Sequence, residues 1–232
     1  MKGRGVRIVL THRDIDEEVV GALVAARGGL SMVREPHGSL RELNEQCLDL
    51  LAGQAAAQPK HGNQLLRLVG DLWSSFDRTA RERAASCPYL LLDVGFTDLT
   101  RWRRFHGQEV NKPPPVPYGG FFTVPQAASV AKRVFMYAWN LASSSSMTAQ
   151  LTLGAPERCT QLISTCTVTQ IHELAEQHPE WLRPRWPTKV NVWRNLLLAA
   201  ASGDGVLLER TRMHGYQLLA NEVRTASLRP VV

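Results

Sequence analysis

The feature that most restricts the fold of this chain is a series of helix start and stop signals between residues 147 and 177. Leu153 followed by Gly154 predicts a helix end, because glycine readily adopts the left-handed conformation found at helix C-termini. Pro156 follows, and proline is favoured in the first turn of a helix. Thr167 and Gln170 have the spacing of a capping box that opens another helix. Helices in this region must therefore be short and joined by tight turns.

Apolar residues at intervals of three and four positions predict helices over most of the chain. The segments with this pattern are about 11–28, 39–53, 63–85 and 124–142. Gly70 lies within the third segment, where glycine costs about 1 kcal/mol relative to alanine.

Residues 88–96 are the passage with the best case for extended structure. Pro88 prevents a helix from continuing into the short apolar run that follows it. Thr97 or Asp98 then begins a short amphipathic helix that includes Trp102. The sequence therefore predicts an all-α, multi-helix fold in which any strand is confined to the neighbourhood of residues 88–96.

A proline-rich stretch within residues 107–123 indicates a linker, since consecutive prolines favour the semi-rigid polyproline II conformation. It could also be a ligand for a proline-binding groove. We expect an N-terminal helical region over 1–112, a linker over 113–123 and a helical dimerisation domain over 124–232. No internal repeat stands out in the sequence.

Composition is that of a folded soluble protein, with 44% hydrophobic and 21% charged residues. No run approaches the roughly eighteen apolar residues of a membrane span. The basic N-terminus is followed only by Ile8-Val9-Leu10, which is too short for a signal peptide. We therefore expect a cytoplasmic protein without membrane spans.

The sequence contains no motif of a known catalytic or cofactor site, so we expect neither an enzyme nor a cofactor. The four cysteines include no C-x-x-C pair, so we interpret them as buried apolar residues and expect no metal. Acidic residues at positions 14–18 could bind a cation, but they more simply complement the dipole at a helix start.

Positive charge is concentrated near the C-terminus. Residues 181–232 carry eight basic and three acidic side chains, a net charge of +5 out of the chain's +6. Such localised charge is what attraction to phosphate backbones requires, although a solvated helix surface can look the same. The candidate DNA-binding residues are Arg183, Arg185, Lys189 and Arg194. The nearby tryptophans at 181, 186 and 193 either anchor the core or stack on nucleic acid.

Residues 149–163 also fit a helix-turn-helix in part. With Gly154 as the turn glycine, the residues at buried positions of that motif are Ala149, Leu153, Ala155 and Ile163. Thr160 occupies a position that is normally apolar. This pattern is a second indication of DNA binding.

The order of signals from Leu153 to Glu176 (Leu-Gly, a short helix, then T-x-x-Q-x-x-x-L-A-E) resembles the FlhD family, the D subunit of the flagellar master regulator. The similarity extends more weakly over about 134–222. It implies an all-helical homodimer that joins a zinc-containing FlhC subunit to bind promoter DNA and activate transcription. The family's cysteine that can link two copies aligns with Leu182. Residues 1–115 have no counterpart in a lone D subunit.

Two functional hypotheses follow. The first is a DNA-associated transcriptional regulator subunit that forms a homodimer and acts with an FlhC-like partner. The alternative is a helical interaction or scaffold protein that does not bind DNA.

Overall fold

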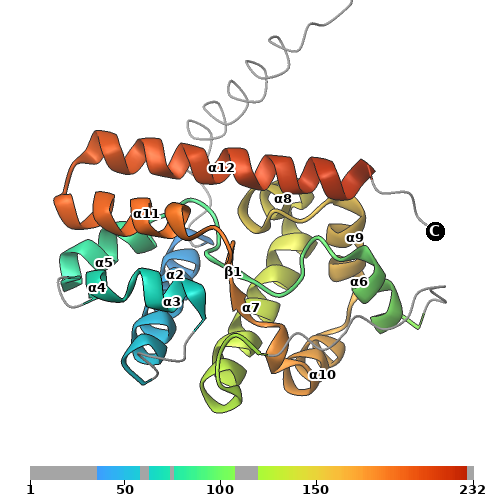
Figure 1. Ribbon diagram of the computed structural model, residues 1–232. Coiled ribbons are helices and arrows are strands. Elements are labelled where there is room, and N and C mark those ends of the chain that lie inside the picture. The colour runs from blue at the N-terminus through green and yellow to red at the C-terminus, as the bar shows by residue number, and fades with distance from the viewer. Residues whose placement is uncertain (1–35, 58–62, 74–75, 108–119, 229–232) are drawn as a thin grey trace, which may run out of the picture. The chain divides into compact units, whose positions relative to one another are not determined.

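The computed structural model describes residues 36–57, 63–73, 76–107 and 120–228 (Figure 1). The helix predicted over 11–28 and most of the predicted linker lie outside these residues. Contacts divide the chain into one unit of residues 1–36 and a second of residues 37–232. The account below concerns the second unit and helix α2, which begins at its boundary.

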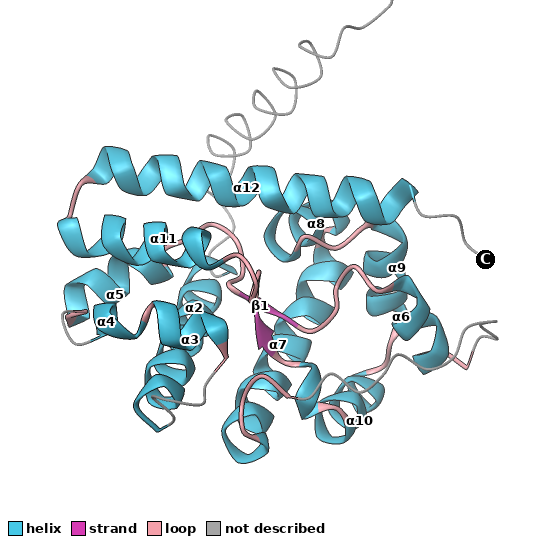
Figure 2. Ribbon diagram, viewed as in Figure 1, coloured by secondary structure: helices cyan, strands magenta, loops and turns pink. Residues whose placement is uncertain are grey.

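Helices make up most of the described chain, and a single two-stranded sheet accompanies them (Figure 2). The predicted all-α, multi-helix fold is therefore confirmed. The helices are α2 (Pro36–Ala57), α3 (Gln64–Leu68), α4 (Gly70–Trp73), α5 (Arg78–Ala85), α6 (Leu99–Phe105), α7 (Val124–Ser144), α8 (Ser146–Leu153), α9 (Glu157–Thr165), α10 (Val168–Gln177), a 3-10 turn η2 (Pro179–Trp181), α11 (Val190–Ser202) and α12 (Gly205–Leu228). Strands β1 (Leu92–Asp93) and β2 (Arg183–Pro184) pair in antiparallel fashion.

Local capping signals set several of these boundaries as predicted. Gly154 has a φ of 63° and ends α8 in the left-handed conformation. Thr167 and Gln170 form both hydrogen bonds of a capping box at the start of α10. Asp98 accepts a hydrogen bond from the Arg101 backbone and caps α6. The two side-chain caps join residues three positions apart, and Gly154 acts through its own backbone, which is why the sequence predicts these boundaries well.

The prediction of one helix over 63–85 was wrong, because the structure divides this segment into α3, α4 and α5. The chain leaves helical geometry at Val69, and Gly70 begins α4. Asp77 then caps α5 by accepting a hydrogen bond from the Ala80 backbone at 2.7 Å. Glycine lowers helix stability here, and an aspartate cap supplies a competing start.

The prediction that any strand lies near residues 88–96 was correct for β1 and wrong for β2. Strand β1 lies within 88–96, whereas β2 at Arg183–Pro184 falls in a segment for which no strand was predicted. A strand of two residues has no periodicity of its own. Only its pairing partner, far away in the sequence, defines it.

The core joins helices from both sides of the predicted linker. Helix α7 packs against α8, α9 and α10, while α11 packs against α3, α5 and α12. Buried side chains before and after residues 113–123 form one continuous cluster, which includes Trp102 and Trp193. Helix α5, which precedes the predicted linker, therefore covers part of α11, which follows it.

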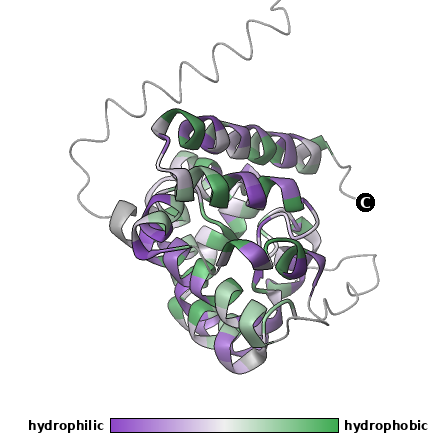
Figure 3. Cartoon of the chain, turned by 60° about the vertical axis from the view of Figure 1, so that its left-hand side comes forward, coloured by the Kyte–Doolittle hydropathy of each residue, from purple (hydrophilic) through white to green (hydrophobic). Residues whose placement is uncertain are grey.

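Hydropathy alternates around α12, which has both hydrophobic and hydrophilic sides (Figure 3). Among the described residues, no helix combines the length and apolar character needed to cross a membrane.

Candidate functional site

Arg183 lies on strand β2 and is held by a carboxylate on strand β1. Its Nε and Nη2 atoms donate to Asp93 Oδ2 at 2.9 and 2.6 Å. The other oxygen of Asp93 accepts from the backbone of Gly95 at 3.0 Å and Phe96 at 3.1 Å. Both donors converge on one carboxylate oxygen, and these charge-assisted hydrogen bonds are stronger than neutral ones. Arg183 therefore joins the two strands, and its charge is neutralised within the molecule.

Arg185 is only 3% exposed, so the prediction that it faces DNA phosphates was wrong. Its guanidinium donates to the carbonyl oxygens of Leu90 at 2.9 Å and Leu153 at 2.6 Å. It also lies 3.6 Å from a carboxylate oxygen of Glu222. Arg185 thus connects the β1 segment, the end of α8 and helix α12. A buried arginine with these partners stabilises the fold and cannot reach a nucleic acid.

The other two candidates differ from each other. Arg194 makes a two-pronged ion pair with Asp71, each nitrogen–oxygen distance being 3.1 Å, and remains 40% exposed. Lys189 is exposed at the start of α11. Of the four predicted DNA contacts, Lys189 alone combines exposure with no carboxylate in ion-pair range among the described residues.

Burial and neighbouring charge act together on the ionisable groups of this cluster. Burial alone would raise the pKa of Asp93, but the Arg183 and Arg185 guanidinium groups hold it below its ordinary value. Burial lowers the pKa of Arg185, opposed by the nearby carboxylates. Burial raises the pKa of Glu222. Asp93 therefore remains ionised at neutral pH and interacts with both arginine charges.

The three tryptophans of this region are structural. Trp186 and Trp193 are buried, and Trp193 Nε1 donates to the Arg185 carbonyl oxygen at 2.7 Å. Trp181 is partly buried, with its ring stacked on His178 and the Arg101 guanidinium 4.2 Å from its centroid. Of the two interpretations of these rings, the structure favours core anchors.

Helices α8 and α9 have the connectivity of a helix-turn-helix, joined by the turn Gly154–Pro156. Thr160 is buried at the position that the motif normally fills with an apolar residue, and its hydroxyl lies 3.3 Å from the Pro156 carbonyl oxygen. That hydrogen bond explains how a polar residue fits there. The exposed side of α9 carries Glu157, Arg158 and Gln161, which gives it little net charge.

Helices α11 and α12 present an exposed surface that sequence reasoning missed. Four large apolar side chains are exposed here: Leu198 by 42%, Val206 by 65%, Leu207 by 42% and Met213 by 38%. Arg210 and His214 are exposed between them. We call these six residues the α11–α12 face. The run Val206-Leu207-Leu208 was an available signal, because three consecutive apolar residues of a helix cannot all point to one core.

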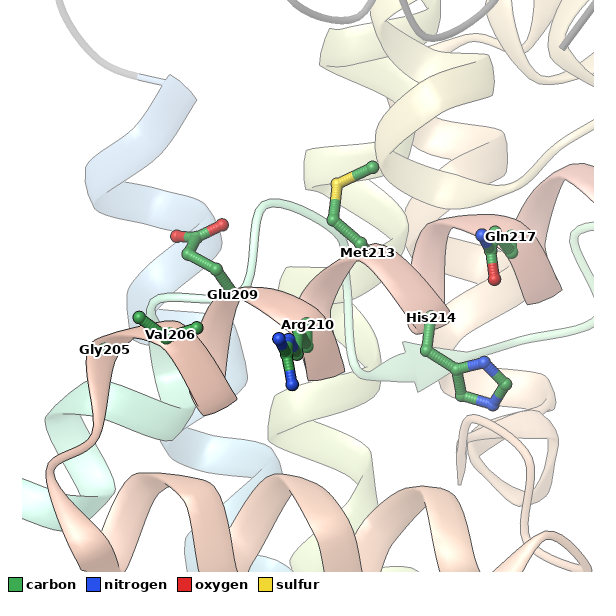
Figure 4. Close-up of a pocket in the computed structure, with 7 residues that line it drawn as sticks. All are labelled: Gly205, Val206, Glu209, Arg210, Met213, His214 and Gln217. Carbon is green, nitrogen blue, oxygen red and sulfur yellow. The ribbon is translucent and has the colours of Figure 1, made fainter.

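Two shallow hollows lie on this face and share Arg210 and His214. The larger one, of about 480 Å³, follows α12 along Val206, Met213 and Gln217 (Figure 4). The smaller one, of about 330 Å³, lies between α11 and α12 and includes Leu198 and Leu207. Apolar hollows with a few charged groups at the edge are typical of contact sites for other molecules.

The four cysteines are unpaired and buried. Burial raises the pKa of Cys87 to about 11 and that of Cys159 to about 12, so these thiols are unreactive at neutral pH. Within the described residues, no group of three or more metal-ligating side chains comes together.

No protein-family model, curated protein or solved structure matches this chain.

Proposed function

We propose that this chain is a non-catalytic helical regulator that acts by binding another protein, and that any contact with promoter DNA is made through that partner. The observation that carries the proposal is a contrast between two surfaces. Arg183, Arg185 and Arg194 are engaged within the molecule. The α11–α12 face, in contrast, leaves large apolar side chains in solvent.

The chemistry of the α11–α12 face selects the partner. An amphipathic helix binds by placing its apolar stripe in a hydrophobic groove. Met213 can adapt its shape to such a stripe in the larger hollow, and Leu198 and Leu207 offer apolar area in the smaller one. Arg210 and His214, which line both hollows, favour carboxylates on the partner. Glu209 also lines the larger hollow, and its carboxylate is paired with Arg212 at 2.8 Å. The proposed ligand is therefore a partner helix whose apolar stripe is flanked by Asp or Glu.

A regulatory role is supported by the segment that resembles FlhD. The helix boundaries on which the resemblance rests, Gly154 at the end of α8 and the Thr167–Gln170 capping box, are present in the structure. FlhD proteins act with a partner subunit, so the resemblance and the exposed apolar face both favour action through protein contact.

Peptide titration tests this proposal. Two labelled synthetic helices share one apolar stripe, flanked by Glu in the first and by Lys in the second. The full-length protein should bind the acidic helix roughly tenfold or more tightly than the basic one, a difference of about 1.4 kcal/mol. Met213→Glu should weaken binding of the acidic helix by a similar factor. Met147→Glu is the matched control, because Met147 is an exposed methionine on a different helix, α8.

Equal affinity for the two peptides, or equal loss in the two Met→Glu variants, would contradict the proposed site. A parallel titration with a labelled DNA duplex tests whether the protein contacts DNA only through its partner. The protein alone should show weak binding with no preference among sequences.

Direct DNA binding by α9 is the second candidate, and the tight Gly154–Pro156 turn favours it. In that case Arg158→Ala would weaken duplex binding, and the salt dependence of binding would fall by about one phosphate contact. Met213→Glu would leave duplex binding unchanged.

A further inference from the structure

Two segments of the chain build the same small corner. Gly95 and Trp186 both have positive φ values, 84° and 52°. Seven residues after each lies a buried tryptophan, Trp102 or Trp193. The indole Nε1 of Trp102 donates to the Gly95 carbonyl oxygen at 3.0 Å. The indole Nε1 of Trp193 donates to the carbonyl oxygen of Arg185, the residue before Trp186, at 2.7 Å. The two corners are offset by 91 residues, 193 minus 102.

The same offset relates the elements around these corners. Strand β1 shifted by 91 residues coincides with β2, and α6 shifted in the same way begins where α11 begins, at Val190. Helix α5 shifted by 91 residues falls within α10, and most of α2 falls on α7. Four elements thus recur in the same order and at the same offset. A chance recurrence of one turn would not reproduce them.

Burial follows the same register. Positions that are buried in both segments include the pairs Leu43 and Val134, Cys47 and Ala138, and Ala84 and Ala175. Asp49 and its equivalent Asn140 are both exposed. The residue types differ at nearly all of these positions, which explains why no repeat is visible in the sequence.

Contacts between the segments have two-fold symmetry. In the sheet, Leu92 pairs with Pro184 and Asp93 pairs with Arg183. Leu92 is equivalent to Arg183 and Asp93 to Pro184, so each position pairs with the equivalent of the other. That reciprocity defines an isologous, two-fold interface. Glu42 and Arg133 are also equivalent, and they form an ion pair at 2.7 Å, which requires both to lie close to the axis.

The terminal helices of the segments are exchanged. Helix α11 of the second segment packs against α3 and α5 of the first, while α6 of the first packs against α9 of the second (Figure 1). Each segment therefore completes the core of the other.

We propose that residues 39–105 and 130–196 are two copies of one structural unit, and that they form an exchanged dimer within a single polypeptide. The interface that a second copy of the chain would use for this exchange is already occupied by the chain's own other half. The homodimer implied by the FlhD resemblance is thus replaced by an internal pseudo-dimer.

Cross-linking of the full-length protein tests whether the two segments pair within one chain or between two chains. A Glu42→Cys, Arg133→Cys double variant is treated with a short bismaleimide; the native cysteines are buried and react slowly. The expected product is an internally linked monomer, and sedimentation should give the mass of one 25.8 kDa chain. The matched control mixes the two single variants, unfolds and refolds them together, and then adds the reagent. Linked dimers in this mixture would show that halves pair between chains and would overturn the proposal.

Equivalence of the two corners has a separate test. Trp102→Phe and Trp193→Phe each remove one indole donor and leave a large aromatic ring. If the segments are equivalent, the two substitutions should lower the denaturation midpoint by similar amounts. The larger decrease should be no more than about twice the smaller. A loss confined to one variant would contradict the equivalence. Correct folding of both variants is checked by circular dichroism.

Discussion

Gly215 lies in the interior of α12, and the structure predicts that Gly215→Ala destabilises the protein. Alanine is normally favoured over glycine within a helix by about 1 kcal/mol. At this position, however, an added Cβ would overlap the Tyr89 ring. Tyr89 is 1% exposed and contacts Trp186 and Tyr216 edge to face, with ring centroids 5.8 and 5.3 Å away. Moving the buried ring away from α12 would disturb these contacts.

The magnitude follows from opposing effects. Overpacking a fixed core side chain costs about 1–3 kcal/mol. Displacing Tyr89 also weakens two aromatic contacts, each worth about 0.5–1.5 kcal/mol. After subtraction of the gain in helix propensity, we expect a net loss of about 2 kcal/mol in the free energy of unfolding. Urea denaturation followed by circular dichroism measures this loss.

Gly53→Ala is the matched control, since Gly53 lies within α2 and nothing surrounds the added Cβ. The same substitution there should stabilise the protein by about 0.5–1 kcal/mol. The two variants should therefore shift the midpoint in opposite directions. If Gly215→Ala were as stabilising as Gly53→Ala, the packing of Tyr89 on α12 would be refuted. In a Tyr89→Leu background, the loss caused by Gly215→Ala should shrink, because the overlapping ring is absent.

Three further predictions concern the arginine cluster and the thiols. Arg185→Lys should destabilise the fold by about 3 kcal/mol in a denaturation experiment, because one ammonium cannot reach the carbonyl oxygens of both Leu90 and Leu153. An unchanged free energy of unfolding would mean that these hydrogen bonds of Arg185 are not needed for stability. The lowered pKa of Asp93 contributes stability that is present above the pKa of an unfolded aspartate, about 3.9, and is lost as the pH falls through the folded value; Asp93→Asn should flatten the acid limb of a stability–pH profile, and an unchanged slope would disprove this account. Thiol titration should find all four cysteines protected in the native protein and reactive in denaturant; rapid reaction of any thiol in the native protein would contradict its burial.

The sequence by itself determined the structures that depend on near neighbours. Gly154 ends a helix because its own backbone can adopt positive φ, and Thr167 caps one because its partner is three residues away. The all-helical fold class follows from many such signals together with helical periodicity. A single glycine, Gly70, was harder to weigh, because its cost is comparable to the gain from its apolar neighbours.

Only the tertiary structure decided the roles of the charged residues. Arg183, Arg185 and Lys189 look alike in the sequence, yet the first pairs with Asp93, the second is buried and the third is exposed. The difference arises from carbonyl and carboxylate groups supplied by segments at least 30 residues away. The internal pseudo-dimer was hidden for a related reason. Burial constrains which positions face the core but permits many apolar residues at each, so two segments can keep one architecture while their sequences diverge.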